Sequence, residues 1–308
     1  MTDVLGPRAP SLDPIGPHAG GTPAVQPERD PVTAGLTTGH EWDGIRELNT
    51  PLPKWWIYTF LASIVFAVGY CILFPSIPWL HDHTTGLLGY STRTALRDDL
   101  AAAGEQQKAM RARIAAASLN AIRRDPELFA FAQAGGNAAF ADNCVPCHRA
   151  GGAGAKGFPN LADDDWLWGG KLADIHQTIT HGIRNADPDS RQSAMPRFGL
   201  DGILTPAQID AVADYVLSLS SGKPAAGEGA KVFAENCAVC HGDKGQGKRE
   251  VGSARLNDKI WLYGHDKATI VDVVTRARNG SMPAWGERLD PVTIKMLAVY
   301  VHALGGGE

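Results

Sequence analysis

The 308-residue chain is poor in cysteine and has no cluster of basic residues. Its five cysteines are too few for a fold that depends on disulfides. The formal net charge is −4, and the absence of a lysine and arginine run argues against a nucleic-acid partner. Glycine and proline are too frequent, at 35 and 20 residues, for a long coiled coil. The length fits about two small domains with extra segments.

Four of the five cysteines lie in two matching motifs, Cys144-Val-Pro-Cys147-His148 and Cys237-Ala-Val-Cys240-His241. The pattern C-x-x-C-H is the attachment motif of c-type haem. Two thiols three positions apart reach the two vinyl groups of one porphyrin, and the adjacent imidazole then lies over the iron. A redox dithiol needs no adjacent histidine, and a zinc ribbon places its second C-x-x-C about 15 to 20 residues away. The sequence therefore predicts two covalently bound haem c groups.

A long uncharged segment precedes these motifs. Residues 55–80 contain no Asp, Glu, Lys, Arg or His, and their core, Ile57 to Phe74, is 18 residues long. As a helix this core spans about 27 Å, close to the thickness of a bilayer. Tryptophans flank the segment and prolines end it, so we expect a transmembrane anchor rather than a buried core helix. Cys71 is interpreted as a small apolar residue within this span.

The anchor divides the chain into segments of different character. Residues 1–39 hold seven prolines and six glycines and are expected to be disordered. Residues 40–54 form a juxtamembrane segment with Arg46 and Lys54, whereas the first basic residue after the anchor is Arg93. This bias places the N-terminus in the cytoplasm and the bulk of the chain in the periplasm. Residues 81–129 are expected to be a connector that contains a helix.

An internal repeat covers the rest of the chain. Gly136–Gly154 aligns with Gly229–Gly247 at an offset of 93, with nine of nineteen positions identical. Further matches include Met195-Pro196 with Met282-Pro283. The apolar pattern of both copies is helical, and no strand signal competes with it. We therefore predict an all-α fold with two homologous domains, residues 130–221 and 222–308, in tandem on a single N-terminal transmembrane helix.

The repeat resembles the small cytochrome c domain. In that family the sixth iron ligand is a methionine 40 to 60 residues after the histidine, and a proline often follows it. Met195 lies 47 positions after His148, and Met282 lies 41 positions after His241. The resemblance thus implies Met195 and Met282 as iron ligands together with His148 and His241. Each methionine ligates either the iron of its own domain or the iron of the other domain. Rival ligands in the sequence are His176, His181 and His265.

Other side chains near these motifs are candidates for the haem propionates or for plain aromatic packing, namely Trp166, Trp168, Trp261, Tyr263, Arg184 and Arg278. Residues 130–221 carry 6 basic and 10 acidic residues, whereas residues 222–308 carry 12 and 10. The acidic run Asp163 to Asp165 is therefore either a docking patch for a basic electron donor or an ordinary solvated helix start.

The segment from His40 to Trp56, followed by one helix and two cytochrome c domains, resembles the dihaem subunit III of cbb3-type cytochrome c oxidase. The resemblance implies a bacterial inner-membrane subunit without a catalytic centre of its own. It would pass electrons from a donor cytochrome c to a monohaem cytochrome c subunit. The haem-copper subunit, which reduces oxygen and pumps protons, would receive them last. Membrane lipid is a further expected partner.

Three alternatives share part of this pattern. A dihaem peroxidase would need one five-coordinate haem, which a methionine candidate for each iron argues against. A free-standing anchored dihaem cytochrome, or the cytochrome subunit of a periplasmic dehydrogenase, would share every haem feature. Only the segment from His40 to Trp56 and the proteins that co-purify with the chain separate these two readings from the oxidase subunit.

Overall fold

The computed structural model describes residues 28–308, and the predicted disorder of residues 1–39 therefore falls largely outside them. These residues belong to two compact units, and the boundary between the units in the chain falls between Asp98 and Asp99. The first unit begins with an antiparallel hairpin of β1 (Thr37–Trp42) and β2 (Ile45–Leu48). Asp43 and Gly44 join the strands with φ angles of 51° and 85°, the left-handed pair of a tight two-residue turn. The hairpin was not predicted from the sequence, although Asp-Gly is a strong hairpin signal.

Helix α1 (Lys54–Leu73) follows the hairpin and none of its residues is buried. It is long and apolar enough to cross a membrane by length and composition. Its last carbonyls are not left without partners, because the chain returns after the prolines. The Leu87 and Leu88 amides donate to the carbonyls of Ile72 and Leu73, at 2.9 and 3.1 Å. The structure thus has the expected apolar helix, with a returning loop that satisfies its C-terminal end.

The second unit begins within helix α2 (Thr92–Ala116), which leads into α3 (Leu119–Arg124). The C-terminal part of α2 is anchored to the rest of the unit. Ile114 is fully buried, and Arg111 forms a 2.6 Å ion pair with Asp290. The Lys295 ammonium donates to the carbonyls of Ala115 and Ala117 at 2.7 and 2.8 Å, which closes the end of α2.

Each repeat then supplies four helices in the predicted order, and the first repeat adds a short 3₁₀ turn. The first repeat contains α4 (Pro126–Asn143), α5 (Val145–His148), η1 (Ala150–Gly152), α6 (Leu172–His181) and α7 (Pro206–Ser220). The second contains α8 (Glu228–Asn236), α9 (Ala238–His241), α10 (Lys267–Arg276) and α11 (Pro291–His302). The described part of each repeat is helical, as the fold class predicts.

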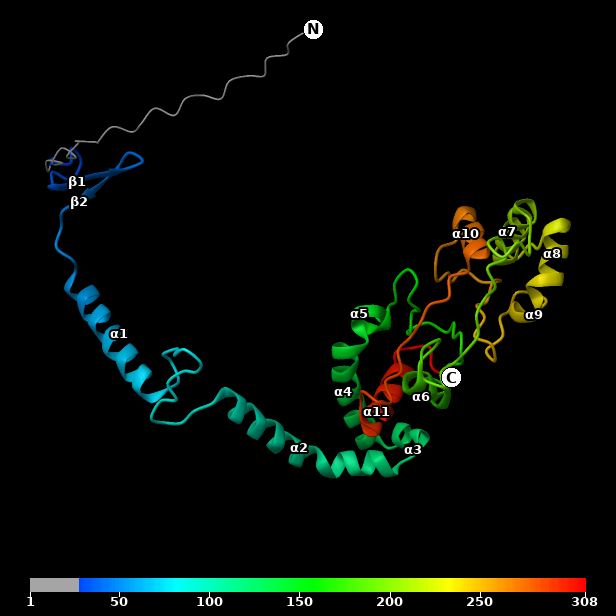
Figure 1. Cartoon of the computed structure of the whole chain (residues 1–308), viewed down its shortest axis with the longest axis horizontal. Helices are drawn as coiled ribbons and strands as arrows, with labels where there is room; N and C mark the ends of the chain where they lie inside the picture. Colours follow the sequence, from blue (N-terminus) through cyan, green and yellow to red (C-terminus); the bar gives the residue numbers. More distant parts are fainter. Residues whose placement is uncertain (1–27) are drawn as a thin grey trace, which may run out of the picture. The chain divides into compact units, whose positions relative to one another are not determined.

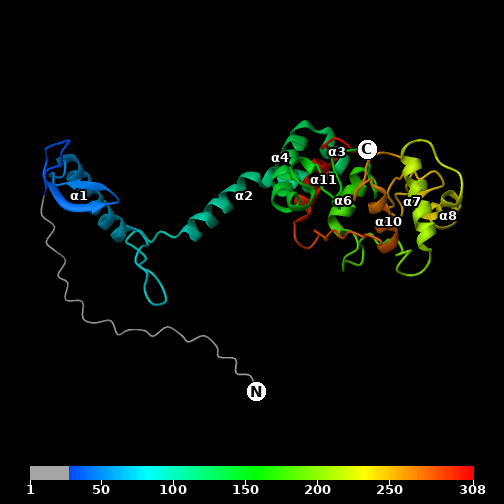
Figure 2. The same cartoon turned by 90° about the horizontal axis from the view of Figure 1, so that it is seen from above.

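The final helices of the two repeats are exchanged in space. Helix α11 packs against α4 and α6, whereas α7 packs against α8 and α10 (Figures 1 and 2). We call the group α4, α5, α6 and α11 module A, and the group α7, α8, α9 and α10 module B. Each module therefore contains the haem motif of one repeat and the last helix of the other. The repeats are continuous in sequence, but the packed modules are not.

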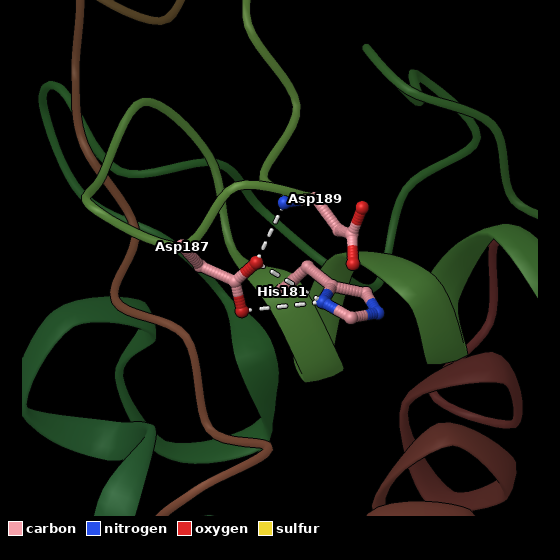
Figure 3. Close-up of side chains that lie close together, drawn as sticks. All are labelled: His181, Asp187 and Asp189. Carbon is pink, nitrogen blue, oxygen red and sulfur yellow. Dashed lines mark hydrogen bonds and ion pairs between the residues drawn. The ribbon is translucent and has the colours of Figure 1, made fainter.

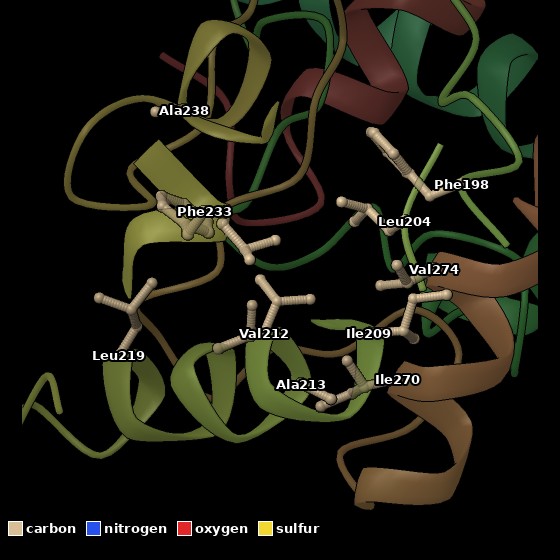
Figure 4. Close-up of a cluster of buried hydrophobic side chains, with 12 residues drawn as sticks. Phe198, Leu204, Ile209, Val212, Ala213, Leu219, Phe233, Ala238, Ile270 and Val274 are labelled. Carbon is tan, nitrogen blue, oxygen red and sulfur yellow. The ribbon is translucent and has the colours of Figure 1, made fainter. Parts of the chain in front are cut away.

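The buried side chains follow this exchanged grouping. In module B, Val212 and Ile209 of α7 share one apolar cluster with Phe233 of α8 and with Ile270 of α10 (Figure 4). In module A, the matching cluster joins Phe140 of α4, two isoleucines of α6 and four residues of α11. Since burial of apolar area is the main driving force of folding, these clusters hold each final helix on the other repeat.

Both modules use the same helix crossing. The Phe140 and Tyr300 rings lie 5.3 Å apart in module A, and the Phe233 and Tyr215 rings lie 5.2 Å apart in module B, at nearly equal tilts. A glycine makes the close approach possible in each case. A Cβ atom added to Gly136 would lie 2.5 Å from Cβ of Tyr300, a distance that real structures do not tolerate.

We expect Gly136→Ala to destabilise the second unit, although alanine is the better helix former. The clash with α11 costs about 1–3 kcal/mol as overpacking, against roughly 1 kcal/mol gained in helix propensity. Gly104→Ala in α2 is the matched control, because no atom lies within 4 Å of its added Cβ. The free energy of unfolding of this control should rise by up to about 1 kcal/mol. Urea unfolding measures the stability of both variants, and equal changes in the two would contradict the tight crossing of α4 and α11.

Candidate haem-binding sites

The two C-x-x-C-H motifs occupy the same position in both modules. Helix α4 ends at Asn143, Cys144 follows, and α5 carries the rest of the motif to His148. Helices α8 and α9 repeat this geometry around Cys237. All five cysteines are unpaired, and burial raises the pKa of Cys144 and Cys237 to about 11. The motif cysteines form no disulfide with one another, which leaves both sulfur atoms of each motif for attachment to a vinyl group.

The motif histidines are oriented by backbone carbonyls. Nδ1 of His148 lies 2.9 Å from the Pro159 carbonyl oxygen, and Nδ1 of His241 lies 2.8 Å from that of Ala254. Because a carbonyl only accepts, each Nδ1 carries the proton and each Nε2 keeps its lone pair. Burial lowers the pKa of both histidines, which favours the neutral ring. A neutral imidazole held through one nitrogen is the arrangement that metal-binding histidines use.

Module B contains an apolar cavity of about 280 Å³ at its motif. Cys237, Cys240 and His241 line it, and so do Met195 and Pro196. Phe233 and Ile270 are among its apolar walls. Two thiols, one imidazole and one thioether around an apolar cavity fit a covalently bound haem. Met195 belongs to the first repeat, so the cavity draws its donors from both repeats.

Module A brings the other methionine to the first motif. Met282 packs against the same buried cluster as Cys144 and Val145. Its main chain pairs with Ile183, just after α6, through two hydrogen bonds of 2.9 and 3.0 Å. Each methionine therefore lies nearer to the motif of the other repeat in the packed structure.

The rival histidines have surroundings of their own. Nδ1 of His181 faces Asp187 at 3.2 Å, and the Asp189 amide donates to the same carboxylate at 2.7 Å (Figure 3). These three side chains form a group with the donor types of a cation site. His176 is half-buried on α6, and His265 is exposed. None of the three histidines is among the residues that line the module B cavity.

Several propionate candidates have protein partners. Trp166 Nε1 donates to the Gly306 carbonyl, and Trp168 covers Gly252, where an added Cβ would clash with the indole ring. Arg278 forms a short ion pair with Asp272 and lies over the Tyr263 ring. These contacts support the packing interpretation for the two tryptophans. Arg184 donates hydrogen bonds to two backbone carbonyls that precede the methionines in the chain.

The acidic run has a different environment from a solvated patch. Only Asp164 is exposed, whereas Asp163 and Asp165 are half-buried and face Asp258 of the second repeat. Burial, followed by repulsion from Asp258, raises the pKa of Asp165 to about 6. Asp163 and Asp165 are thus partly shielded from solvent and Asp164 is the exposed member of the run, so a docking role for the run stays a prediction.

Family models match three consecutive parts of the chain. The N-terminal domain of cytochrome oxidase-cbb3, FixP, matches residues 34–81, and cytochrome c matches residues 133–220. Cytochrome c oxidase, cbb3-type, subunit III matches residues 224–301. The first match covers the hairpin and helix α1, and the other two cover one repeat each.

Curated relatives are similar over nearly the whole chain. The cbb3-type cytochrome c oxidase subunit FixP of Azorhizobium caulinodans is 55% identical over 276 residues, which is 88% of this chain and 94% of the relative. The corresponding FixP of a Bradyrhizobium species is 53% identical, over 91% of this chain and 98% of the relative. The subunit CcoP of Cereibacter sphaeroides is 49% identical, over 92% of this chain and 100% of the relative. The chain belongs to the FixP/CcoP family of cbb3-type cytochrome c oxidase subunits.

Family membership settles the cofactor and the class of chemistry. This FixP/CcoP chain carries two cytochrome c domains and hence covalently bound haem c, and it is a membrane-bound electron-transfer subunit. The resemblance stated from the His40 to Trp56 segment and from the tandem haem motifs is thereby confirmed. The peroxidase, free-standing carrier and dehydrogenase alternatives fall away.

Sequence reasoning missed two residues of this FixP/CcoP chain that contact the methionines. Asn279 and Asn185 hydrogen-bond to the main chains of Met195 and Met282. Each asparagine directly follows an arginine, and the two Arg-Asn pairs are 94 positions apart. Their repetition at nearly the offset of the haem motifs is a signal that was available in the sequence.

Proposed function

We propose that the two irons are ligated across the repeats. The haem attached through Cys144 and Cys147 takes His148 and Met282. The haem attached through Cys237 and Cys240 takes His241 and Met195. The observation that supports this assignment is the exchange of the final helices, since Met195 lines the cavity of the second motif and Met282 packs against the same cluster as Cys144 of the first.

The residues around each site favour electron transfer over substrate chemistry. Haem c, when bound, supplies a one-electron Fe(III)/Fe(II) couple. The cysteines would hold the group in place, the carbonyl-bound histidine would present Nε2 to the iron, and the methionine would offer a neutral thioether as a second protein ligand. With two protein ligands, such an iron would be suited to electron transfer rather than to binding oxygen or peroxide. Apolar walls exclude water and limit the reorganisation that accompanies a change of charge.

The proposed route follows from the family. Electrons enter from a donor cytochrome c, pass through the two haems and continue to the monohaem subunit. From there they reach the haem-copper subunit, where oxygen is reduced and protons are pumped. The subunit would lie in the bacterial inner membrane with its N-terminus in the cytoplasm and its haem modules in the periplasm. Arg46 and Lys54 before α1, with no basic residue after it until Arg93, support this orientation.

A shortened chain that begins at Ser91 tests which part of the chain binds haem and which part holds the subunit in the oxidase. It lacks the hairpin and α1 but keeps the whole second compact unit. We expect it to be soluble, to carry both haems and to accept electrons from a chemical reductant, because no contact of the two modules is removed. It should fail to co-purify with the oxidase in mild detergent, whereas the full chain does so.

The full-length chain, expressed and solubilised in the same way, is the control for this experiment. Normal oxidase assembly around the shortened chain would show that the hairpin and α1 are not needed to hold this subunit in the oxidase. Loss of haem from the shortened chain would instead contradict the independence of the second unit.

A further inference from the structure

The main chains of both methionines are held by asparagine side chains from the other repeat. The Met195 amide donates to Oδ1 of Asn279 at 2.9 Å, and Nδ2 of Asn279 donates to the Met195 carbonyl at 3.1 Å. One carboxamide thus satisfies both main-chain polar groups of Met195. In module A, Nδ2 of Asn185 donates to the Met282 carbonyl at 2.7 Å.

The two asparagines are themselves fixed to different degrees. Nδ2 of Asn185 also donates to the His181 carbonyl, and its Oδ1 accepts from the Asp187 amide at 2.7 Å. The contact between Nδ1 of His181 and the Asp187 carboxylate, at 3.2 Å, closes the same loop (Figure 3). Met282 is further held by its two hydrogen bonds to Ile183. Met282 therefore has several main-chain restraints, whereas Met195 depends on Asn279.

One guanidinium joins the two methionine loops. Nη1 of Arg184 donates to the Ser193 carbonyl, two residues before Met195, at 2.7 Å. Its Nε donates to the Gly280 carbonyl, two residues before Met282, also at 2.7 Å. Arg184 adopts a left-handed backbone, with φ at 47°, which is a costly conformation for a residue with a Cβ atom. The surrounding hydrogen bonds maintain this conformation.

We propose that Asn279 and Asn185 are positioning residues for the axial methionines, and that Arg184 links the two ligand loops into one clamp. The proposal rests on the proposed role of Met195 and Met282 as ligands. A preorganised loop keeps a weak thioether ligand on the iron, because departure of the sulfur by loop opening must also break the clamp. Asn279 should matter more than Asn185, since Met282 keeps its bonds to Ile183.

Imidazole added to the full-length, haem-loaded ferric protein in detergent is the probe. It competes with the methionine sulfur, and its affinity is read from the absorption spectrum. Loss of two hydrogen bonds in Asn279→Ala should raise imidazole affinity roughly ten- to a hundredfold at the haem attached through Cys237. Asn185→Ala should raise it less than about tenfold, and at the other haem. Asn279→Asp keeps the acceptor for the Met195 amide and should give an intermediate change.

Matched controls separate positioning from general damage. Asn257→Ala removes an asparagine whose side chain bonds the Lys244 carbonyl at 3.0 Å and neither methionine main chain, and it should leave imidazole affinity unchanged. Asn257→Asp controls for the charge added by Asn279→Asp. The midpoint potential of the affected haem should fall with each active variant, because a haem that loses its thioether is easier to oxidise.

The outcomes are separable. Equal imidazole affinities in Asn279→Ala and Asn257→Ala would overturn the proposal, as would equal changes at both haems. If Asn279→Ala fails to fold, the comparison of Asn279→Asp with Asn257→Asp decides the matter. Met195→Ala tests the ligand role itself. If Met195→Ala changes imidazole affinity and the Asn279 variants do not, the proposed function stays intact and only the positioning role of Asn279 is refuted.

Discussion

Replacing Met282 with alanine will alter the haem attached through Cys144 and Cys147, and the haem attached through Cys237 and Cys240 will stay six-coordinate. The reason is that Met282 packs beside Cys144 in module A, although it belongs to the second repeat. The altered haem loses its thioether, so its potential should fall and its ferrous form should bind carbon monoxide. About half of the haem in the sample should react.

Double variants identify which haem has changed. If the exchanged assignment holds, His148→Ala with Met282→Ala damages one haem and leaves one six-coordinate haem intact. His241→Ala with Met282→Ala damages both. Ligation within each repeat would give the opposite counts. The counts of intact haem remain valid even if a histidine variant fails to attach its haem, and Met110→Ala serves as a methionine control.

Cutting the chain between the repeats will not separate them. Residues 221–227 are exposed, and a site for a specific protease inserted there leaves α7 and α8 in place. Because α7 buries Val212 and Val216 with α8, and α11 buries Leu297 and Val301 with α4, each fragment holds one helix of the other. Full burial of each such side chain contributes about 1.5–3 kcal/mol, and a dissociation constant of 1 μM corresponds to about 8 kcal/mol, so the four named side chains alone supply an interaction of that order.

Size-exclusion chromatography of the cut chain that begins at Ser91 provides the measurement. We expect one peak that contains both fragments and both haems, and two peaks only in denaturant. The uncut chain with the same insertion is the control. Separation of the fragments in native buffer would show that each repeat folds with its own final helix, and it would remove the basis of the exchanged ligands.

Much of this protein is determined by its sequence. The two C-x-x-C-H motifs specify the haem chemistry because the thiol spacing and the adjacent imidazole are local properties of the chain. The uncharged stretch that contains α1 is equally local, since length and composition alone match a bilayer. The repeat and the helical periodicity predicted the fold class, and the segment from His40 to Trp56 carried the resemblance to the family that the relatives confirm.

Only the tertiary structure decided which helix packs on which motif. Tyr215 and Tyr300 are equivalent in the repeat, and so are Gly136 and Gly229, so either final helix presents the same groups to either first helix. A sequence with two nearly equivalent partners does not choose between them, because an exchanged element makes the same contacts as an unexchanged one. The choice depends on contacts between distant residues, such as Asn279 with Met195 and Ile183 with Met282. These contacts exist only once the chain has folded.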